Sequence, residues 1–454
     1  MTADVFNTVE ILPSDENILN AFTKDSVDRV RYVFSMYEMI NRKEFPFSSV
    51  SLDGPWGSGK TFFIKMLMML IRTKSDEPGY EDYKVILDAK ERQFCKRNSK
   101  NLIYPIYFDA WKNDSATDPL LSLLYTMCKD TGITHLNDPQ IETVVKSILK
   151  TTLKFSLKTA SIIPGTPDYS DLVDSVCESF KTDSPFGPVI DAERLSQDLD
   201  SLLNKLVERI GKPIVVFIDE LDRCSPTFAI KLLESVKHYF SNNKILFVFS
   251  VNILELQHSI QCVYGQNFNS TRYLDRFFNI RFNLPVVETA DFLRKEFSCD
   301  TFSDSVSHII VTLSELFNLQ LRELVKFNDL VRFINESANY IVQRNYSNGY
   351  EFIHKFFIPI ALALKFTDPN KFQLFITGKG HEILNKVFFH NYIKKYCSFY
   401  LKSDEQLSDS ELLNRLNESY NALFYYSDKN VEIGQCIFYR DCYEIFKSKV
   451  GFFS

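Results

Sequence analysis

The stretch GPWGSGKT occupies residues 54–61. Its spacing, G-x-x-x-x-G-K-[ST], is typical of a loop whose glycines let backbone N–H groups turn toward phosphate oxygens. In such a loop the lysine reaches the β- and γ-phosphates and the hydroxyl residue ligates Mg²⁺, which are the roles predicted for Lys60 and Thr61. The residues expected to contact the nucleotide are Gly54, Pro55, Trp56, Gly57, Ser58, Gly59, Lys60, Thr61 and Phe62.

The residues on either side of the loop predict a strand before it and a helix after it. FPFSSVSLD (45–53) is short and β-prone, whereas FFIKMLMMLI (62–71) is apolar and contains no Gly or Pro. A strand, a glycine loop and a helix in this order place a phosphate group at the N-terminus of the helix. The context therefore supports a phosphate-binding loop over a chance glycine-rich turn.

Further apolar runs predict the rest of the sheet. They are IYPIYFDAWK (103–112), GKPIVVFIDELDR (211–223), KILFVFSVN (244–252) and FNIRFNLP (278–285). Continuous apolar strands that alternate with helices predict a parallel sheet covered by helices on both faces. No strand is expected after about residue 286. The predicted fold class is α/β, a P-loop NTPase parallel-sheet core with a helical insertion and a C-terminal all-helical region.

Pattern changes along the chain predict four segments. These are an irregular N-terminal lead-in (1–24), a core with an insertion at about 130–200 (25–290), a helical lid (291–345) and a C-terminal helical domain (346–454). An amphipathic helix is expected over residues 25–43. The polar stretch 74–100 includes the basic run KERQFCKRNSK (90–100), which is either a polyanion contact or a solvated loop.

Composition narrows the class of protein. The 454 residues are 45% hydrophobic and 24% charged, which is typical of a globular chain. The net charge of −6 argues against nucleic acid covering the whole surface, although a local groove stays open. The nine cysteines form no C-x-x-C pair, which favours reduced thiols in a cytoplasmic protein. No run of about 18 apolar residues occurs, so membrane insertion is not expected.

Hydrolysis requires more than a phosphate loop, because an acid must hold Mg²⁺ and another group must position water. Asp219 follows an apolar strand, and the carboxyl ends of such strands bind ligands in open α/β sheets. We expect Asp219 to hold Mg²⁺ together with Thr61. The adjacent Glu220 is expected to orient or deprotonate the attacking water.

Four further polar residues are candidates, each with a structural alternative. Arg223 is either an arginine finger for a neighbouring subunit or an ion-pair partner of Asp222. Asn252 either senses the γ-phosphate or water, or caps the helix that follows it. Arg276 is a second finger candidate, and Arg322 is expected to fold over the nucleotide from the lid. For both arginines a surface salt bridge is the alternative.

Taken together, four motifs resemble the KAP family of P-loop NTPases within the STAND/AAA-like group. They are GPWGSGKT, YFDAWKND (107–114), IDELDRC (218–224) and YLDRFFNIRFNLP (273–285). With DSVDRV (25–30), the resemblance spans roughly residues 25–340. It implies Mg²⁺-dependent ATP hydrolysis by a cytosol-facing regulator, with ATP and Mg²⁺ as cofactors. Bacterial members are often associated with defence against phages or plasmids, so a homo-oligomer and a separate effector protein are the expected partners.

The chain departs from the family pattern at two places. Many members carry transmembrane helices within the NTPase core, but the corresponding KSILKTTLKFSLKTASII (146–163) contains recurring lysines and is amphipathic. Asn252 stands where the family often has Asp, which leaves its sensing role open. Trp111 and Lys112 belong to a family-specific strand, where Trp111 is expected to pack in the core beside the phosphate loop.

The sequence leaves three possible functions. The first is an ATPase switch within a defence or effector assembly, the second a DNA-associated motor or loader, and the third a nucleotide-gated scaffold with little turnover. Glu220 argues against the scaffold, and the acidic charge balance with no recognisable DNA-binding module argues against the motor. ATPase rates with and without DNA, and solution mass with and without ATP, distinguish the three.

Overall fold

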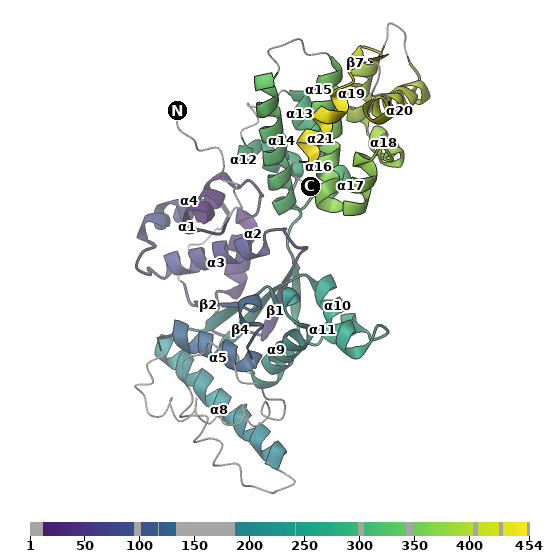
Figure 1. Cartoon of the computed structure of the whole chain (residues 1–454). Coiled ribbons are helices and arrows are strands. Elements are labelled where there is room, and N and C mark those ends of the chain that lie inside the picture. The colour runs from purple at the N-terminus through teal and green to yellow at the C-terminus, as the bar shows by residue number, and fades with distance from the viewer. Residues whose placement is uncertain are drawn as a thin grey trace. The chain divides into compact units, whose positions relative to one another are not determined.

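The structure is a computed structural model, in which residues 12–94, 101–116, 118–132, 187–240, 242–297, 304–341, 348–402, 407–425 and 430–451 are described. The chain forms two compact units (Figure 1). The sheet unit consists of Pro13–Thr23 and Arg29–Pro285, and the helical unit includes Lys24–Asp28 and Val286–Ser454. The segment boundaries predicted at residues 290 and 345 stay predictions.

A five-stranded parallel sheet in the order β2-β3-β4-β1-β5 forms the centre of the sheet unit. Its strands are β1 (Ser49–Asp53), β2 (Tyr104–Asp109), β3 (Ile214–Asp219), β4 (Ile245–Val251) and β5 (Ile280–Asn283). The α/β fold class is therefore confirmed. Because all these strands run parallel, the loop after β1 and the acids after β3 emerge at the same edge of the sheet, with β4 between them.

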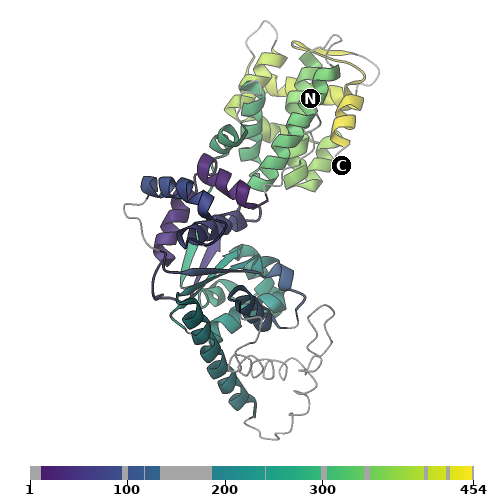
Figure 2. The ribbon, with the colours of Figure 1, turned by 90° about the vertical axis from the view of Figure 1, so that its left-hand side faces the viewer.

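Helices cover both faces of this sheet (Figures 1 and 2). One face packs against α1 (Asp15–Lys24), α2 (Val30–Ile40), α3 (Lys60–Lys74) and α4 (Lys84–Phe94), with the 3-10 turn η1 (Glu81–Tyr83) before α4. The other face packs against α5 (Pro119–Asp130), α8 (Gly187–Ile210), α9 (Pro226–Tyr239), α10 (Ile253–Tyr264) and α11 (Ser270–Leu274). The short 3-10 turns η2 (Trp111–Asn113) and η4 (Leu221–Arg223) follow β2 and β3.

Alternation along β3 decides the side on which its terminal acid lies. Val215 and Phe217 belong to the same apolar cluster as α2 and α3, whereas Val216 and Ile218 belong to the cluster of α5, α8 and α9. Successive strand residues point to opposite faces, so Asp219, two residues beyond Phe217, points to the α3 face. The phosphate loop leads directly into α3, and the acid therefore approaches the start of that helix.

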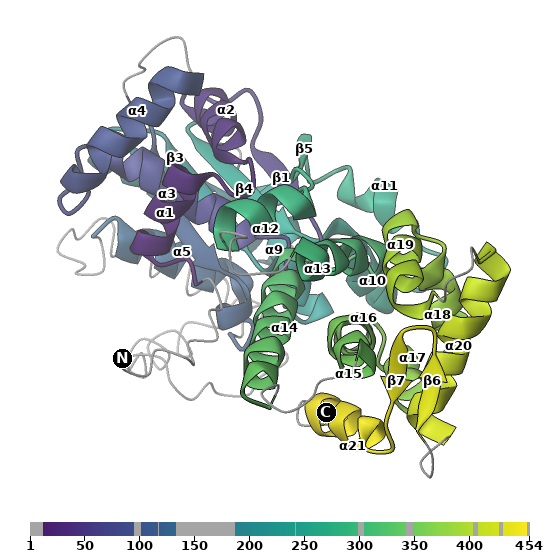
Figure 3. The same ribbon diagram turned by 90° about the horizontal axis from the view of Figure 1, so that it is seen from above.

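The helical unit has one apolar core to which nearly all its elements contribute. Its elements are α12 (Thr289–Phe297), α13 (Asp304–Leu316), α14 (Leu321–Ile341), α15 (Asn348–Phe352), the π-helix η6 (Ile353–Phe357), α16 (Ile358–Thr367), α17 (Pro369–Ile376), α18 (His381–Phe388), α19 (Asn391–Leu401), α20 (Asp409–Tyr425), β6 (Val431–Ile433), β7 (Cys436–Phe438) and α21 (Cys442–Gly451). Figure 3 shows the β6–β7 hairpin beside α20.

The expectation that no strand follows residue 286 is wrong, because β6 and β7 form an antiparallel hairpin. Gly434 adopts a positive φ of 60° in the tight turn between them, a conformation that glycine adopts without strain. The lead-in is not irregular over residues 15–24, where Ile18 and Phe22, one helical turn apart, bury α1 against the core. The helix expected over 25–43 is shorter, Val30–Ile40.

The basic run at 90–100 is not a solvated loop in its described part, because residues 90–94 end α4. Within this helix Glu91 is buried and pairs with Lys74 at 2.5 Å. The rest of the run, residues 95–100, lies outside the described residues, as does most of the insertion predicted at 130–200, including 146–163. Across the described ranges, no helix is both long enough and apolar enough to cross a membrane.

Candidate functional site

The loop between β1 and α3 presents its backbone to a ligand at the helix N-terminus. Gly57 and Gly59 have φ of 77° and 90°, which only glycine adopts readily, and Gly59 caps α3. A Cβ on Gly54 would lie 2.9 Å from Ser58 Oγ and 3.3 Å from Leu284 Cβ, so the chain is packed too closely there for a side chain. The first N–H groups of a helix lack intrahelical acceptors and attract anions, so this loop is suited to phosphate.

Lys60 is folded back into the loop. The residue is only 9% exposed, and its Nζ donates to the carbonyl oxygens of Gly54 at 2.6 Å and Pro55 at 3.2 Å. Burial lowers the pKa of Lys60, while the nearby carboxylates of Asp222 and Asp219 oppose that shift. The backbone oxygens are weaker partners than phosphate, so an incoming nucleotide can exchange for them.

Asp219 and Thr61 supply oxygen donors of the type that Mg²⁺ prefers. Asp219 is 1% exposed, and its Oδ1 accepts the Glu220 N–H at 3.0 Å. Thr61 is half-buried in the first turn of α3. Beside Asp219 in the sheet register, the buried Ser250 hydroxyl has no hydrogen-bond partner among the described residues. This donor set fits Mg²⁺, which is commonly held by few side chains together with waters and substrate phosphates.

Glu220 has a strained backbone at the end of β3. Its φ is 60°, a left-handed conformation uncommon for residues other than glycine and often found at functional sites. Its Oε1 lies 3.1 Å from Nη1 of Arg223 in the following 3-10 turn. Burial raises the pKa of the Glu220 carboxyl, and the charge of Arg223 opposes the rise. A carboxylate with a raised pKa is suited to act as a general base.

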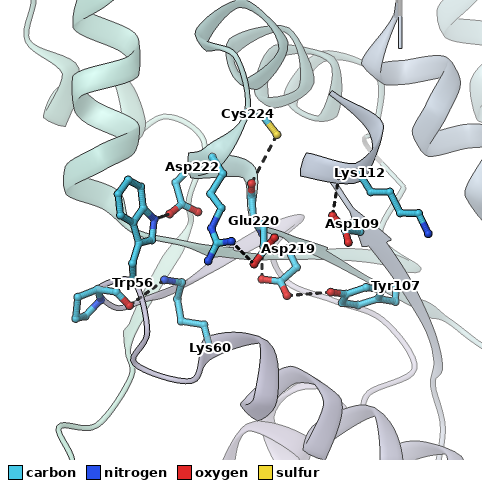
Figure 4. Close-up of polar contacts among 11 residues, drawn as sticks. Trp56, Lys60, Tyr107, Asp109, Lys112, Asp219, Glu220, Asp222 and Cys224 are labelled. Atoms are coloured by element: carbon cyan, nitrogen blue, oxygen red, sulfur yellow. Dashed lines mark hydrogen bonds and ion pairs between the residues drawn. The ribbon is translucent and has the colours of Figure 1, made fainter. Parts of the chain in front are cut away.

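Arg223 therefore pairs with Glu220, and the alternative pairing with Asp222 is wrong. Asp222 instead accepts the indole N–H of Trp56 at 2.5 Å, which links the phosphate loop to the turn after β3 (Figure 4). A 3-10 helix has three residues per turn, so the consecutive side chains of Asp222 and Arg223 point in different directions and do not pair.

Trp111 is 56% exposed, so the expectation that it packs in the core is wrong. The chain leaves the sheet immediately after β2, where Asp109 Oδ1 accepts the Lys112 N–H at 2.9 Å and shapes the turn. The guanidinium carbon of Arg223 lies 5.4 Å from the centroid of the Trp111 ring, within the range of a cation–π contact. Trp111 thus lines the site beside Arg223.

Four other residues that the sequence predicts at the site are Asn252, Arg276, Phe62 and Arg322. Asn252 Oδ1 accepts the Leu254 N–H at 3.2 Å and caps α10, while its sensing role stays a prediction. Arg276 is exposed between α11 and β5. The side chain of Phe62 packs partly against the α2–α3 core, and its contact with the nucleotide stays a prediction. Arg322 lies exposed on α14 in the helical unit, and its contact with a nucleotide stays a prediction.

Two residues that the sequence did not single out stand next to this site. The hydroxyl of Tyr107 on β2 donates to Asp219 Oδ2 at 3.0 Å, and the ammonium of Lys65 lies 3.1 Å from the centroid of the Tyr107 ring. Burial, together with the charge of Asp219, raises the pKa of Tyr107, so its phenol remains a donor. Tyr107 lies within the motif YFDAWKND, but only the pairing of β2 with β3 reveals its partner.

Arg29 is a third residue that the sequence did not identify. It is 4% exposed, and its Nη1 and Nη2 donate to the carbonyl oxygens of Ser58 at 2.6 Å and Pro285 at 2.7 Å. Burial lowers the pKa of Arg29 to about 10. Arg29 and Pro285 are the residues at which the chain enters and leaves the main part of the sheet unit. The guanidinium therefore ties the phosphate loop to both points.

Arg29→Met is expected to lower the free energy of unfolding by roughly 3 kcal/mol, because one buried and one partly buried carbonyl oxygen lose a charged donor. Urea denaturation measures the change. Arg31→Met, two residues further along and exposed on α2, is the control and should change stability by about 0.5 kcal/mol or less. Equal losses in the two variants would show that the guanidinium contacts contribute little.

The comparison with known protein families agrees with the phosphate-loop fold described above. A family described as "KAP family P-loop domain" matches residues 29–336. The uncharacterized protein MJ0182 of Methanocaldococcus jannaschii is 26% identical over 168 residues, which cover 31% of this chain and 87% of that protein. A structure of the Aeropyrum pernix ORC2 protein (ADPNP-ADP complexes) aligns with 95% of this chain and 93% of its own at 10% identity, with a TM-score of 0.30. That last similarity is too low to bear on function.

Proposed function

The chain belongs to the KAP family of P-loop domains, and on that premise we propose that it hydrolyses ATP with Mg²⁺ as a nucleotide-driven switch. One observation carries the proposal. The Lys60 loop, the buried Asp219 and the strained Glu220 meet at one edge of the parallel sheet, on the side of α3. A phosphate cradle, a metal-binding acid and a base are the parts that hydrolysis of a nucleoside triphosphate requires.

In the proposed reaction, each group has one role. The backbone N–H groups at the start of α3 and the ammonium of Lys60 bind the phosphates. Thr61 and Asp219 would hold Mg²⁺, which supplies neutralisation of the phosphate charge when it is bound. Glu220 orients the attacking water and accepts its proton.

While Glu220 is paired with Arg223, the site is in a state of low hydrolytic activity. A carboxylate that is engaged by a guanidinium 3.1 Å away is a weaker base than a free one. A γ-phosphate is a competing anion with a geometry that suits the guanidinium fork. We infer that Arg223 transfers from Glu220 to the γ-phosphate bound by an adjacent subunit, which frees the base.

The same ion pair favours a second candidate function, a nucleotide-gated scaffold with little turnover. If Arg223 stays on Glu220 after ATP binds, the protein would change state without rapid hydrolysis. Phosphate release from ATP, measured with and without DNA and alongside solution mass, distinguishes the switch from the scaffold and from a DNA-associated motor. The switch predicts Mg²⁺-dependent release that DNA does not stimulate.

The wider role that we propose is a switch in a bacterial anti-phage defence assembly, on the basis of the family resemblance. ATP binding would order the lid segment 291–345, with Arg322 over the nucleotide, and would promote self-association. A separate effector protein would read this state. Hydrolysis would then reset the switch.

Assembly gives a further prediction, in which Arg223 or Arg276 reaches the γ-phosphate of an adjacent subunit. Turnover per subunit should rise with protein concentration, as measured by phosphate release over a dilution series. Mixing an Arg223→Ala, Arg276→Ala double variant with Lys60→Ala protein should restore part of the activity, because each supplies what the other lacks. Turnover that is independent of concentration, with a monomer by light scattering in ATP, would contradict assembly.

A further inference from the structure

The acid that is proposed to hold Mg²⁺ is fixed in orientation by two hydrogen bonds. One carboxylate oxygen of Asp219 accepts the backbone N–H of Glu220, and the other accepts the phenol of Tyr107, each at 3.0 Å. The backbone bond is available to any Asp at this position. The phenol bond depends on a tyrosine on the neighbouring strand, in register with Phe217.

The hydroxyl of Tyr107 has this carboxylate as its hydrogen-bond partner, while its ring packs partly against the core around α2 and α3. A phenylalanine would fill the same space. The hydroxyl therefore contributes to the site through Asp219, because the ring alone would suffice for packing. Figure 4 shows the phenol directed at Asp219, on the side away from Trp56 and Asp222.

Lys65 connects this pair to the helix of the phosphate loop. It lies on α3 four residues after Thr61, and residues at this spacing share one face of a helix. Its ammonium lies 3.1 Å from the Tyr107 ring centroid, close enough for a strong cation–π interaction in a partly buried setting. Helix α3, strand β2 and strand β3 thus meet through Lys65, Tyr107 and Asp219.

We propose that Tyr107 is a positioning residue, which holds the Asp219 carboxylate in the orientation that Mg²⁺ binding needs, and that Lys65 holds the Tyr107 ring in place. The inference rests on the proposed function, because it concerns the same metal site. Partners of this kind typically change metal affinity or activity by about 10- to 100-fold when they are removed.

Tyr107→Phe removes only the hydroxyl and is the first test. The measurement is binding of the non-hydrolysable ATP analogue AMP-PNP, followed by calorimetry over a Mg²⁺ titration and again in EDTA. We expect the Mg²⁺ concentration for half-maximal enhancement of binding to rise about tenfold or more. Binding in EDTA should match that of the wild type, because Lys60 and the α3 N–H groups are unchanged.

Tyr104→Phe is the matched control. Tyr104 lies on the same strand, and its hydroxyl donates to the Asp130 carbonyl oxygen, away from the site, so its Mg²⁺ titration should equal that of the wild type. Lys65→Met keeps the length of the side chain and removes the ammonium from the Tyr107 ring, which should raise the Mg²⁺ concentration for half-maximal enhancement by a smaller factor. Loss of its positive charge near Asp219 would by itself lower that concentration, so a rise reports the loss of the ring contact. This second variant tests the same contact from α3.

The outcomes separate the two proposals. A wild-type titration in Tyr107→Phe, or an equal loss of binding in Mg²⁺ and in EDTA, overturns the positioning role and leaves the proposed function intact. A wild-type protein that binds AMP-PNP with no Mg²⁺ dependence overturns the proposed metal site itself, and the role of Tyr107 with it. A shift in Tyr107→Phe that Tyr104→Phe reproduces assigns the effect to strand β2 as a whole and overturns the inference.

Discussion

Lys60→Ala protein is expected to show no saturable ATP binding by calorimetry at concentrations that saturate the wild type. Lys60 is the ammonium of the phosphate loop, 9% exposed and held 2.6 Å from the Gly54 carbonyl oxygen at the place where phosphate enters. Its loss removes a charge-assisted contact to the β- and γ-phosphates, and contacts of this kind are about twice as strong as neutral hydrogen bonds. The backbone N–H groups of the loop alone would then have to offset the negative charges of the phosphates.

Lys112→Ala is the control for this variant. Lys112 lies at the same edge of the sheet, but it is exposed and extends away from Lys60 in Figure 4. Its removal lowers the positive charge of the region equally and should leave ATP affinity close to that of the wild type. An affinity of Lys60→Ala equal to that of Lys112→Ala would refute the assignment of the loop.

Glu220→Gln is expected to retain ATP binding and to lose hydrolysis by about 10²-fold or more. The amide keeps the shape of the side chain but cannot accept the proton of the attacking water. The substitution also removes the ion pair with Arg223. Release of Arg223 would by itself favour hydrolysis, so it does not explain a loss of rate. Single-turnover phosphate release with excess enzyme separates this chemical step from binding.

Asp222→Asn tests the specificity of that result. Asp222 is nearly buried, and one of its oxygens accepts the Trp56 indole N–H, so its role here is to link the turn to the phosphate loop. We expect a smaller loss of rate than in Glu220→Gln. Unchanged turnover in Glu220→Gln together with a large loss in Asp222→Asn would move the base to Asp222.

The sequence predicted the parts of the site that depend on local spacing. The loop at 54–61 and the end of β3 combine a fixed motif with apolar runs, and these local patterns define Lys60, Thr61 and Asp219 as candidates before the strand order is known. The parallel sheet could be predicted because β3 and β4 are nearly continuous apolar runs, which is typical of strands buried on both faces. The structure places the phosphate loop and Asp219 at the same edge of the sheet, and the ligand roles of Lys60, Thr61 and Asp219 stay predictions.

Contacts between distant segments could not be predicted in this way. Tyr107 meets Asp219 only because β2 lies beside β3, a pairing between segments 112 residues apart. Arg29 contacts Ser58 and Pro285, which lie 29 and 256 residues further along the chain. The exposure of Trp111 depends on the turn that Asp109 shapes, whereas its apolar character alone suggested burial.

Small elements were missed for a different reason. β6 and β7 have three residues each, too few to show the alternation that identifies a strand, and their glycine turn was the available signal. Helix α1 carries two buried residues, Ile18 and Phe22, within a polar segment. Such elements are stabilised by the core they pack against, so their own composition indicates them weakly.

Phosphate release from ATP by the wild-type protein, in Mg²⁺ and in EDTA, with Lys60→Ala protein as the baseline, tests the central claim most directly. The account predicts release that requires Mg²⁺ and falls to the spontaneous rate in Lys60→Ala. Release in the wild type that is no faster than the Lys60→Ala baseline, or a rate that survives in EDTA, would contradict hydrolysis at this site.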